Sequence, residues 1–112
     1  MLDADPELAA RARYGLAWTS SSAGRHDDAA DHLATLLERR NLDPTLAASA
    51  CELLIWTHHE RGDPRAAQGA WTLLAQRIDD TARLLDGAFT VSAAWASSES
   101  PGEASAFWEG VA

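Results

Sequence analysis

The sequence predicts an all-α fold, in which six helices form three consecutive hairpins. Strand-like alternation of apolar and polar residues is absent, and the chain is rich in Ala, Leu and Arg, which favour helices. Three similar segments recur along the chain: AGRHDDAADHL at 23–33, RGDPRAAQGAW at 61–71 and SESPGEASAFW at 98–108. A repeat of nearly constant period is typical of stacked helical hairpins.

Helix starts are marked by a short polar residue followed by proline, at Asp5-Pro6, Asp43-Pro44, Asp63-Pro64 and Ser100-Pro101. The polar side chain accepts from amides of the first turn, and proline loses nothing at a position that needs no N–H donor. Ser100 and Glu103 also have the spacing of a capping box. Acidic residues indicate two further starts, at His26-Asp27-Asp28 and at Asp79-Asp80-Thr81.

The predicted helices span residues 6–22, 26–39, 44–60, 64–78, 81–97 and 101–112. Their connections are short, so successive helices fold back on each other as antiparallel pairs. We therefore expect one domain over 1–112, with hairpins at 6–39, 44–78 and 81–112.

Each repeated segment places a small residue one turn before a bulky one. The pairs are Ala29 and Leu33, Ala67 and Trp71, and Ala104 and Trp108. Ala67 follows Ala29 by 38 residues, and Ala104 follows Ala67 by 37. We interpret the alanine as a point of close helix approach and the bulky residue as the side chain that fills the space between hairpins.

These pairs resemble the second-helix motif of tetratricopeptide-repeat (TPR) proteins. The family's first-helix motif is matched loosely by Leu16-Ala17 with Ser20, Leu54-Ile55 with His58, and Val91-Ser92 with Trp95. Gly24 and Gly62 match its turn glycine, whereas Glu99 occupies that place in the third unit. The period is longer than the family's usual 34 residues, and Arg13, Cys51 and Ala88 replace its early tryptophan. The resemblance implies a right-handed α-α superhelix.

The resemblance also implies a concave groove lined by the first helix of each hairpin, where partner peptides bind. The matching positions are Arg11, Tyr14, Trp18, Ser21 and Ser22 in the first hairpin, Ser49, Glu52, Trp56, His59 and Glu60 in the second, and Asp86, Phe89, Ala93, Ala96 and Ser97 in the third. Trp18 and Trp56 precede the turn glycines by the same six residues. Two interpretations remain open for this pair: an aromatic groove floor shared with Tyr14 and Phe89, or burial between hairpins.

The charge balance argues against nucleic-acid and membrane partners. Nine basic residues, all of them Arg, stand against 17 acidic ones, which gives a net charge of −8 at pH 7. Such a chain repels phosphates and anionic lipids. We expect no signal peptide or membrane anchor, because no apolar run is long enough. A single cysteine excludes an intrachain disulfide, and with the Arg-only basic set it favours a cytoplasmic bacterial protein.

The sequence offers weak candidates for chemistry. His58 and His59 are adjacent, so their side chains point about 100° apart on a helix and do not share one metal ion readily. Asp28 and His32 have the spacing of an ordinary helix-surface pair. Cys51 lies in an apolar segment, as a core thiol does. We expect neither catalysis nor a metal or other cofactor.

The last predicted helix presents Phe107, Trp108 and Val111, with no following helix to cover them. The end of a helical stack usually carries a polar outer face, so these residues form a candidate self-association edge. The first functional hypothesis is a scaffold module that binds a protein or peptide in the groove. The alternative is a structural or regulatory helical segment of a larger bacterial regulator or assembly, which self-associates as a homodimer through this edge. A second way to cover the edge is that these residues belong to a longer array.

Overall fold

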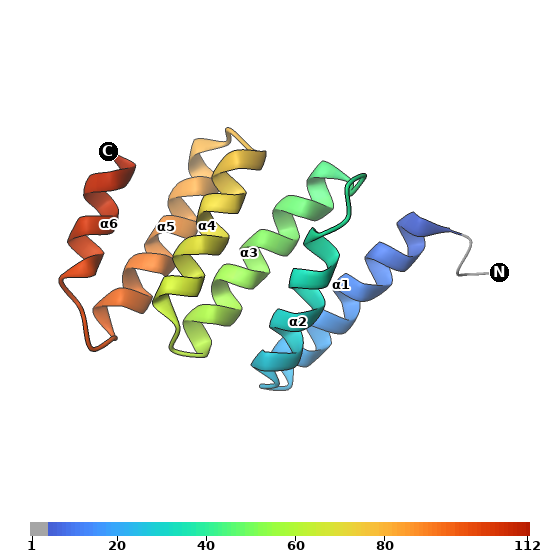
Figure 1. The fold of residues 1–112 in the computed structure, drawn as a ribbon, viewed down its shortest axis with the longest axis horizontal. Coiled ribbons are helices and arrows are strands. Elements are labelled where there is room, and N and C mark those ends of the chain that lie inside the picture. The colour runs from blue at the N-terminus through green and yellow to red at the C-terminus, as the bar shows by residue number, and fades with distance from the viewer. Residues whose placement is uncertain (1–4) are drawn as a thin grey trace.

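The computed structural model describes residues 5–112 and confirms the all-α prediction. Six helices follow one another: α1 (Pro6–Ser22), α2 (His26–Leu37), α3 (Pro44–Glu60), α4 (Pro64–Arg77), α5 (Thr81–Ala96) and α6 (Glu103–Val111) (Figure 1). Residues 5–112 contain no strand. Five of the six predicted helix starts agree with the structure.

Aspartate side chains cap four of these helices, and three of these caps are at the Asp-Pro starts where the sequence predicts them. The Asp5 carboxylate accepts from two amides of the first turn of α1, at 3.0 and 3.1 Å. Asp43 and Asp63 each accept from one amide, at 3.0 and 3.1 Å. Asp80 does the same for α5 at 3.2 Å. Each bond satisfies a donor that lacks an intrahelical partner.

The start of α6 differs from the prediction. The helix begins at Glu103, and Gly102 precedes it without a side-chain cap. The capping box predicted for Ser100 does not form, because the backbone there is held in turns. The Ser100 amide donates to the hydroxyl of Ser98 at 3.0 Å, and the Glu103 amide donates to the Ser100 carbonyl at 3.0 Å. Helix α2 also ends earlier than predicted, at Leu37.

Two tight turns close the first two hairpins, and both require glycine. Gly24 has φ of 79° and Gly62 has φ of 73°, a left-handed conformation that other residues adopt at a cost. Consecutive helices pack together, and in addition α1 contacts α3 and α3 contacts α5. Helices α2 and α4, by contrast, do not contact each other. The resulting array measures 51 × 30 × 19 Å, with the hairpins side by side along its long axis (Figure 1).

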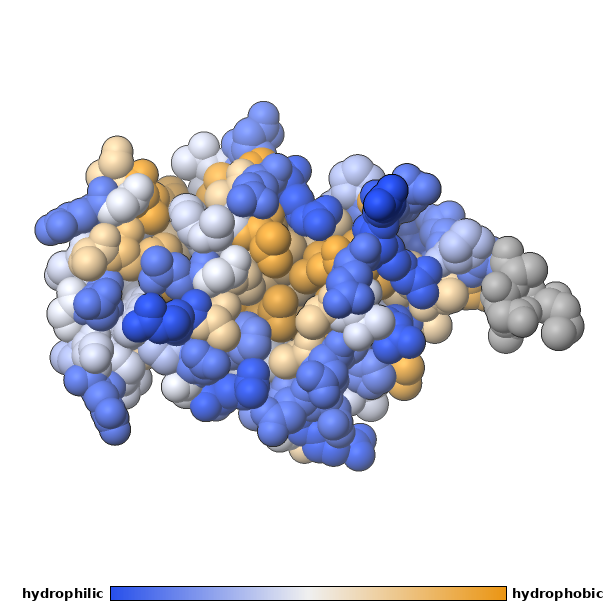
Figure 2. All heavy atoms as spheres, viewed as in Figure 1, coloured by the Kyte–Doolittle hydropathy of each residue, from blue (hydrophilic) through white to orange (hydrophobic). Residues whose placement is uncertain are grey.

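One hydrophobic core cluster includes residues from all six helices. Helix α3 contributes more residues to it than any other helix and contacts α1, α2, α4 and α5. Its buried residues are Leu46, Ala47, Ala48, Ala50, Cys51, Leu53, Leu54, Ile55 and Thr57. On the face where α2 and α4 lie toward the viewer, hydrophobic residues gather in the middle of a largely hydrophilic surface (Figure 2).

Trp71 joins the second hairpin to the third. Its indole nitrogen donates to the carbonyl of Leu84 at 2.8 Å, and its ring meets Phe107 edge-on at 5.3 Å between centroids. Gly87 makes room for the indole, because a Cβ at that position would lie 3.0 Å from Trp71 Cδ1. The alanines that pair with the bulky residues in the first two repeats, Ala29 and Ala67, are fully buried.

Phe107 corrects one sequence prediction. We placed it on an exposed self-association edge, but its side chain is 6% exposed. The side chain turns inward and packs against Trp71, so it belongs to the core cluster. This packing removes much of the apolar area that the sequence predicted at the end of the array.

We predict that Trp71→Ala lowers the free energy of unfolding by about 3 kcal/mol, because it removes a large ring from the junction together with its hydrogen bond to the Leu84 carbonyl. Urea unfolding followed by circular dichroism measures this change. Leu73→Ala on the same helix is the matched control, since Leu73 is exposed and its loss should cost less than about 1 kcal/mol. Equal costs for the two variants would contradict the junction assigned to Trp71.

Candidate functional site

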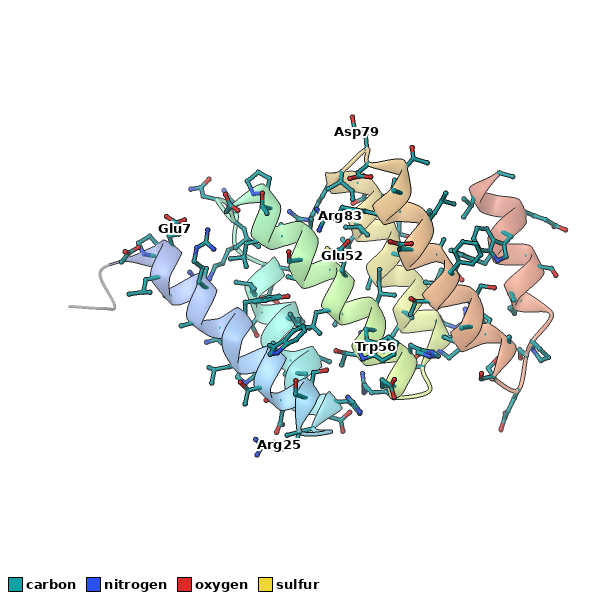
Figure 3. All side chains as sticks on the ribbon, turned by 180° about the vertical axis from the view of Figure 1, so that it is seen from behind. Glu7, Arg25, Glu52, Trp56, Asp79 and Arg83 are labelled. Carbon is teal, nitrogen blue, oxygen red and sulfur yellow. The ribbon has the colours of Figure 1, made fainter. Side chains whose placement is uncertain are left out.

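Helix α3 exposes a single stripe along its length. Ser49 and Glu52 are half-buried and Trp56 is 48% exposed, whereas nearly all other positions from Leu46 to Thr57 are buried. The spacing of three and four residues puts the three side chains on one face of the helix. This face looks toward the same side of the array as α1 and α5 (Figure 3).

A cavity of about 400 Å³ opens between this stripe and α1. Its lining residues are Tyr14, Trp18, Ser49, Glu52, Leu53 and Trp56. Trp18 is 56% exposed, so both indoles lie at the surface and are not buried between the hairpins. Of the two interpretations left open by the sequence, the structure agrees with the aromatic surface. Leu53, a buried residue that is not among the predicted groove positions, also lines the cavity.

Glu52 carries the only charge among these lining residues. Arg83 of α5 donates to it through two nitrogens, with Nε at 2.9 Å from Oε2 and Nη2 on Oε1. The two side chains point toward each other from neighbouring helices, with Trp56 further along α3 (Figure 3). Burial raises the pKa of the Tyr14 phenol, and the negative charge of Glu52 raises it further. Tyr14 therefore stays a neutral hydroxyl at physiological pH.

Other predicted groove residues lie near this cavity but do not line it. Arg11 is exposed and pairs with Glu7 on its own helix at 3.3 Å. Ser22 is exposed at the end of α1. His59 is half-buried, and its ring lies 5.5 Å from the Trp56 ring. These positions extend the same face beyond the two ends of the cavity.

Phe89 is separate from the α1–α3 cavity. It is 64% exposed on α5, and its ring contacts Trp108 of α6 with 5.1 Å between centroids. The expected single aromatic floor is therefore divided into two parts. Trp108 is half-buried and Val111 is exposed, so these two residues and Phe89 keep apolar surface at the third hairpin.

A larger cavity, of about 570 Å³, lies where the described part of the chain begins. It is lined by Pro6, Glu7, Ala10, Arg39, Arg40, Asn41, Leu42, Asp43 and Leu46. This cavity was not predicted from the sequence, because its lining residues come together only when the segment after α2 packs near α1. Arg39 bridges the two segments by donating to the Pro6 carbonyl at 3.2 Å. We favour the smaller cavity as the site because two exposed tryptophans, Trp18 and Trp56, line it.

Cys51 is completely buried, and burial raises the pKa of its thiol. Over residues 5–112, no group of three or more His, Cys, Asp or Glu side chains is arranged to hold a metal ion. Within the same range, no helix combines the length and the apolar character that a membrane crossing requires.

Comparison of the chain with protein-family models, with curated proteins and with solved structures finds no match.

His58 gives the hairpin turn a pH dependence. Its Nδ1 lies 3.0 Å from the guanidinium of Arg61, and burial, followed by the charge of Arg61, lowers the pKa of the imidazole. A neutral imidazole accepts a hydrogen bond from Arg61, whereas an imidazolium does not. In the folded chain the ring therefore favours the neutral form.

We predict that stability falls as the pH drops from about 7.5 through the unfolded-state pKa of about 6.5. Below that pH the unfolded chain binds a proton that the folded chain resists, because the pKa is lower in the fold. His58→Gln should reduce the loss between pH 7.5 and 5.5, measured by urea unfolding at each pH. The same pH slope in both proteins would show that His58 is not responsible.

Proposed function

We propose that the chain is a non-catalytic protein-interaction module whose helical hairpins form a TPR-like, right-handed superhelix. The pattern of helix contacts supports this arrangement. The first helices of successive hairpins touch, α1 with α3 and α3 with α5, whereas α2 and α4 stay apart. A stack whose members are closer on one side curves toward that side, so α1, α3 and α5 line a concave face.

One observation carries the proposed function: two tryptophans are exposed on adjacent helices of this face and line one cavity. Trp18 and Trp56 each leave about half of the side chain in water. Tryptophan combines a large contact area with low flexibility, and it is enriched among residues that dominate binding energy. Covering both rings with a partner would remove exposed apolar area from water.

The repeat places equivalent residues on all three helices of this face. Tyr14, Glu52 and Phe89 occupy equivalent positions on α1, α3 and α5, and Trp18, Trp56 and Ala93 occupy the next equivalent positions one turn on. Two parallel rows therefore cross the array. An extended peptide that runs across α1, α3 and α5 meets an aromatic ring on each helix.

We predict that a phage-displayed library of random peptides yields binders to the wild-type protein that are lost with Trp18→Ala/Trp56→Ala. A pair of hot-spot residues is worth at least about 2 kcal/mol, so the double variant should weaken binding by roughly 30-fold or more. Fluorescence anisotropy of the selected peptides gives the dissociation constants. Leu16→Ala is the matched control, because Leu16 is exposed on α1 but does not line the cavity. Equal affinity for both variants would contradict the groove.

The second candidate function is self-association at the third hairpin. Phe89, Leu85 and Val111 are exposed, and Trp108 lies against Phe89, so α5 and α6 share an apolar surface. A two-fold contact between copies is the commonest way to cover such a surface. This candidate differs from the sequence hypothesis, because Phe107 is buried and Phe89 takes its place at the edge.

If this surface forms a dimer, light scattering at about 100 µM protein should give twice the monomer mass of 12.0 kDa. Phe89→Glu should return the mass to that of a monomer, because a charge buried in an apolar contact loses its hydration. Wild-type protein that is monomeric at this concentration would exclude the second candidate and leave the groove hypothesis intact.

A further inference from the structure

We infer that the partner segment inserts a cationic side chain, Arg or Lys, into the α1–α3 cavity, where aromatic rings and the Glu52 carboxylate hold its charge. This inference depends on the proposed peptide-binding function and specifies the chemistry of the ligand. The occupant is one basic residue of an extended peptide that crosses the concave face.

The aromatic walls favour a cation. Trp18, Trp56 and Tyr14 present three π systems to one cavity, and the face of such a ring attracts a guanidinium or an ammonium group. The chain makes this kind of contact elsewhere: the guanidinium of Arg65 lies over the ring of Trp95, 5.8 Å from its centroid. Tryptophan gives the strongest contact of this kind among the aromatic residues.

The one charged residue that lines the cavity has the complementary sign. Glu52 lines it, and no basic residue does. Arg83 binds Glu52 from α5 and uses one bond to each oxygen, so the carboxylate retains lone pairs for another donor. On the same face, Glu60 and Asp86 are exposed and have no ion pair within residues 5–112. The whole chain, at −8, attracts a basic partner over a longer range.

Other side chains fit less well. An acidic residue would meet Glu52 in a partly enclosed space and be repelled. A purely apolar residue would cover Glu52 without replacing the water that it loses, which carries a desolvation cost. A basic residue satisfies both parts of the site, because its aliphatic stem contacts the rings and its charged end reaches the carboxylate.

The test uses three tripeptides that differ in the central side chain: Ac-Gly-Arg-Gly-NH₂, the citrulline analogue, which has nearly the shape of arginine but no charge, and the glutamate analogue. Each is titrated into ¹⁵N-labelled protein, and the indole N–H signals are followed by NMR. We expect the arginine peptide to shift the Trp18 and Trp56 signals saturably, with at least about tenfold higher affinity than the citrulline peptide.

Two of the other three tryptophans are internal references. Trp71 and Trp95 donate their indole N–H groups to the Leu84 carbonyl and to Gln68 Oε1, so their signals should stay in place. Equal affinity for arginine and citrulline, tighter binding of glutamate, or no shift at Trp18 and Trp56 would each overturn the inference. The proposed groove would still stand if peptides from the library bind through the same two tryptophans.

Two variants separate charge recognition from structural support. Glu52→Gln should weaken the arginine peptide by about tenfold and leave the citrulline peptide unchanged. Arg83→Gln breaks the same ion pair but keeps the Glu52 charge, and the side chain that it changes does not line the cavity. The Arg83→Gln protein should therefore bind the arginine peptide at least as well as wild type. Equal weakening by both variants would show that the ion pair merely supports the fold, and would also overturn the inference.

Discussion

The burial of helix α3 constrains the rest of the molecule. This helix contacts α1, α2, α4 and α5, and most of its length from Leu46 to Thr57 is hidden from water. A single hairpin cannot cover a helix that is apolar on so many sides. The first and third hairpins pack on either side of the second, and the six helices together extend 51 Å along the longest axis.

The candidate site is the part of α3 that this packing leaves uncovered. Ser49, Glu52 and Trp56 form the remaining stripe, and α1 adds Tyr14 and Trp18 to its edge. Rings exposed beside a well-packed core are available to a partner without any rearrangement of that core. The Glu52–Arg83 pair ties the stripe to α5, so the cavity wall is fixed from both neighbouring helices.

The helix boundaries were largely predictable, because they depend on local chemistry. Asp5, Asp43 and Asp63 cap their helices as expected from the following proline. Ser100 has the same pattern and does not cap, since its own backbone joins a turn with Ser98 before the helix begins. A serine hydroxyl competes with nearby backbone groups for the same hydrogen bonds, and the sequence pattern does not reveal which of them forms.

The sequence by itself determined the six helices and the glycine turns at Gly24 and Gly62, because capping and left-handed φ angles act within a few residues. Tertiary structure alone decided which apolar side chains stay in water: Phe107 is buried against Trp71, whereas Phe89 remains exposed. It also brought together Glu52 and Arg83, 31 residues apart. These outcomes depend on how the hairpins rotate as they pack, and helical periodicity alone does not specify that rotation.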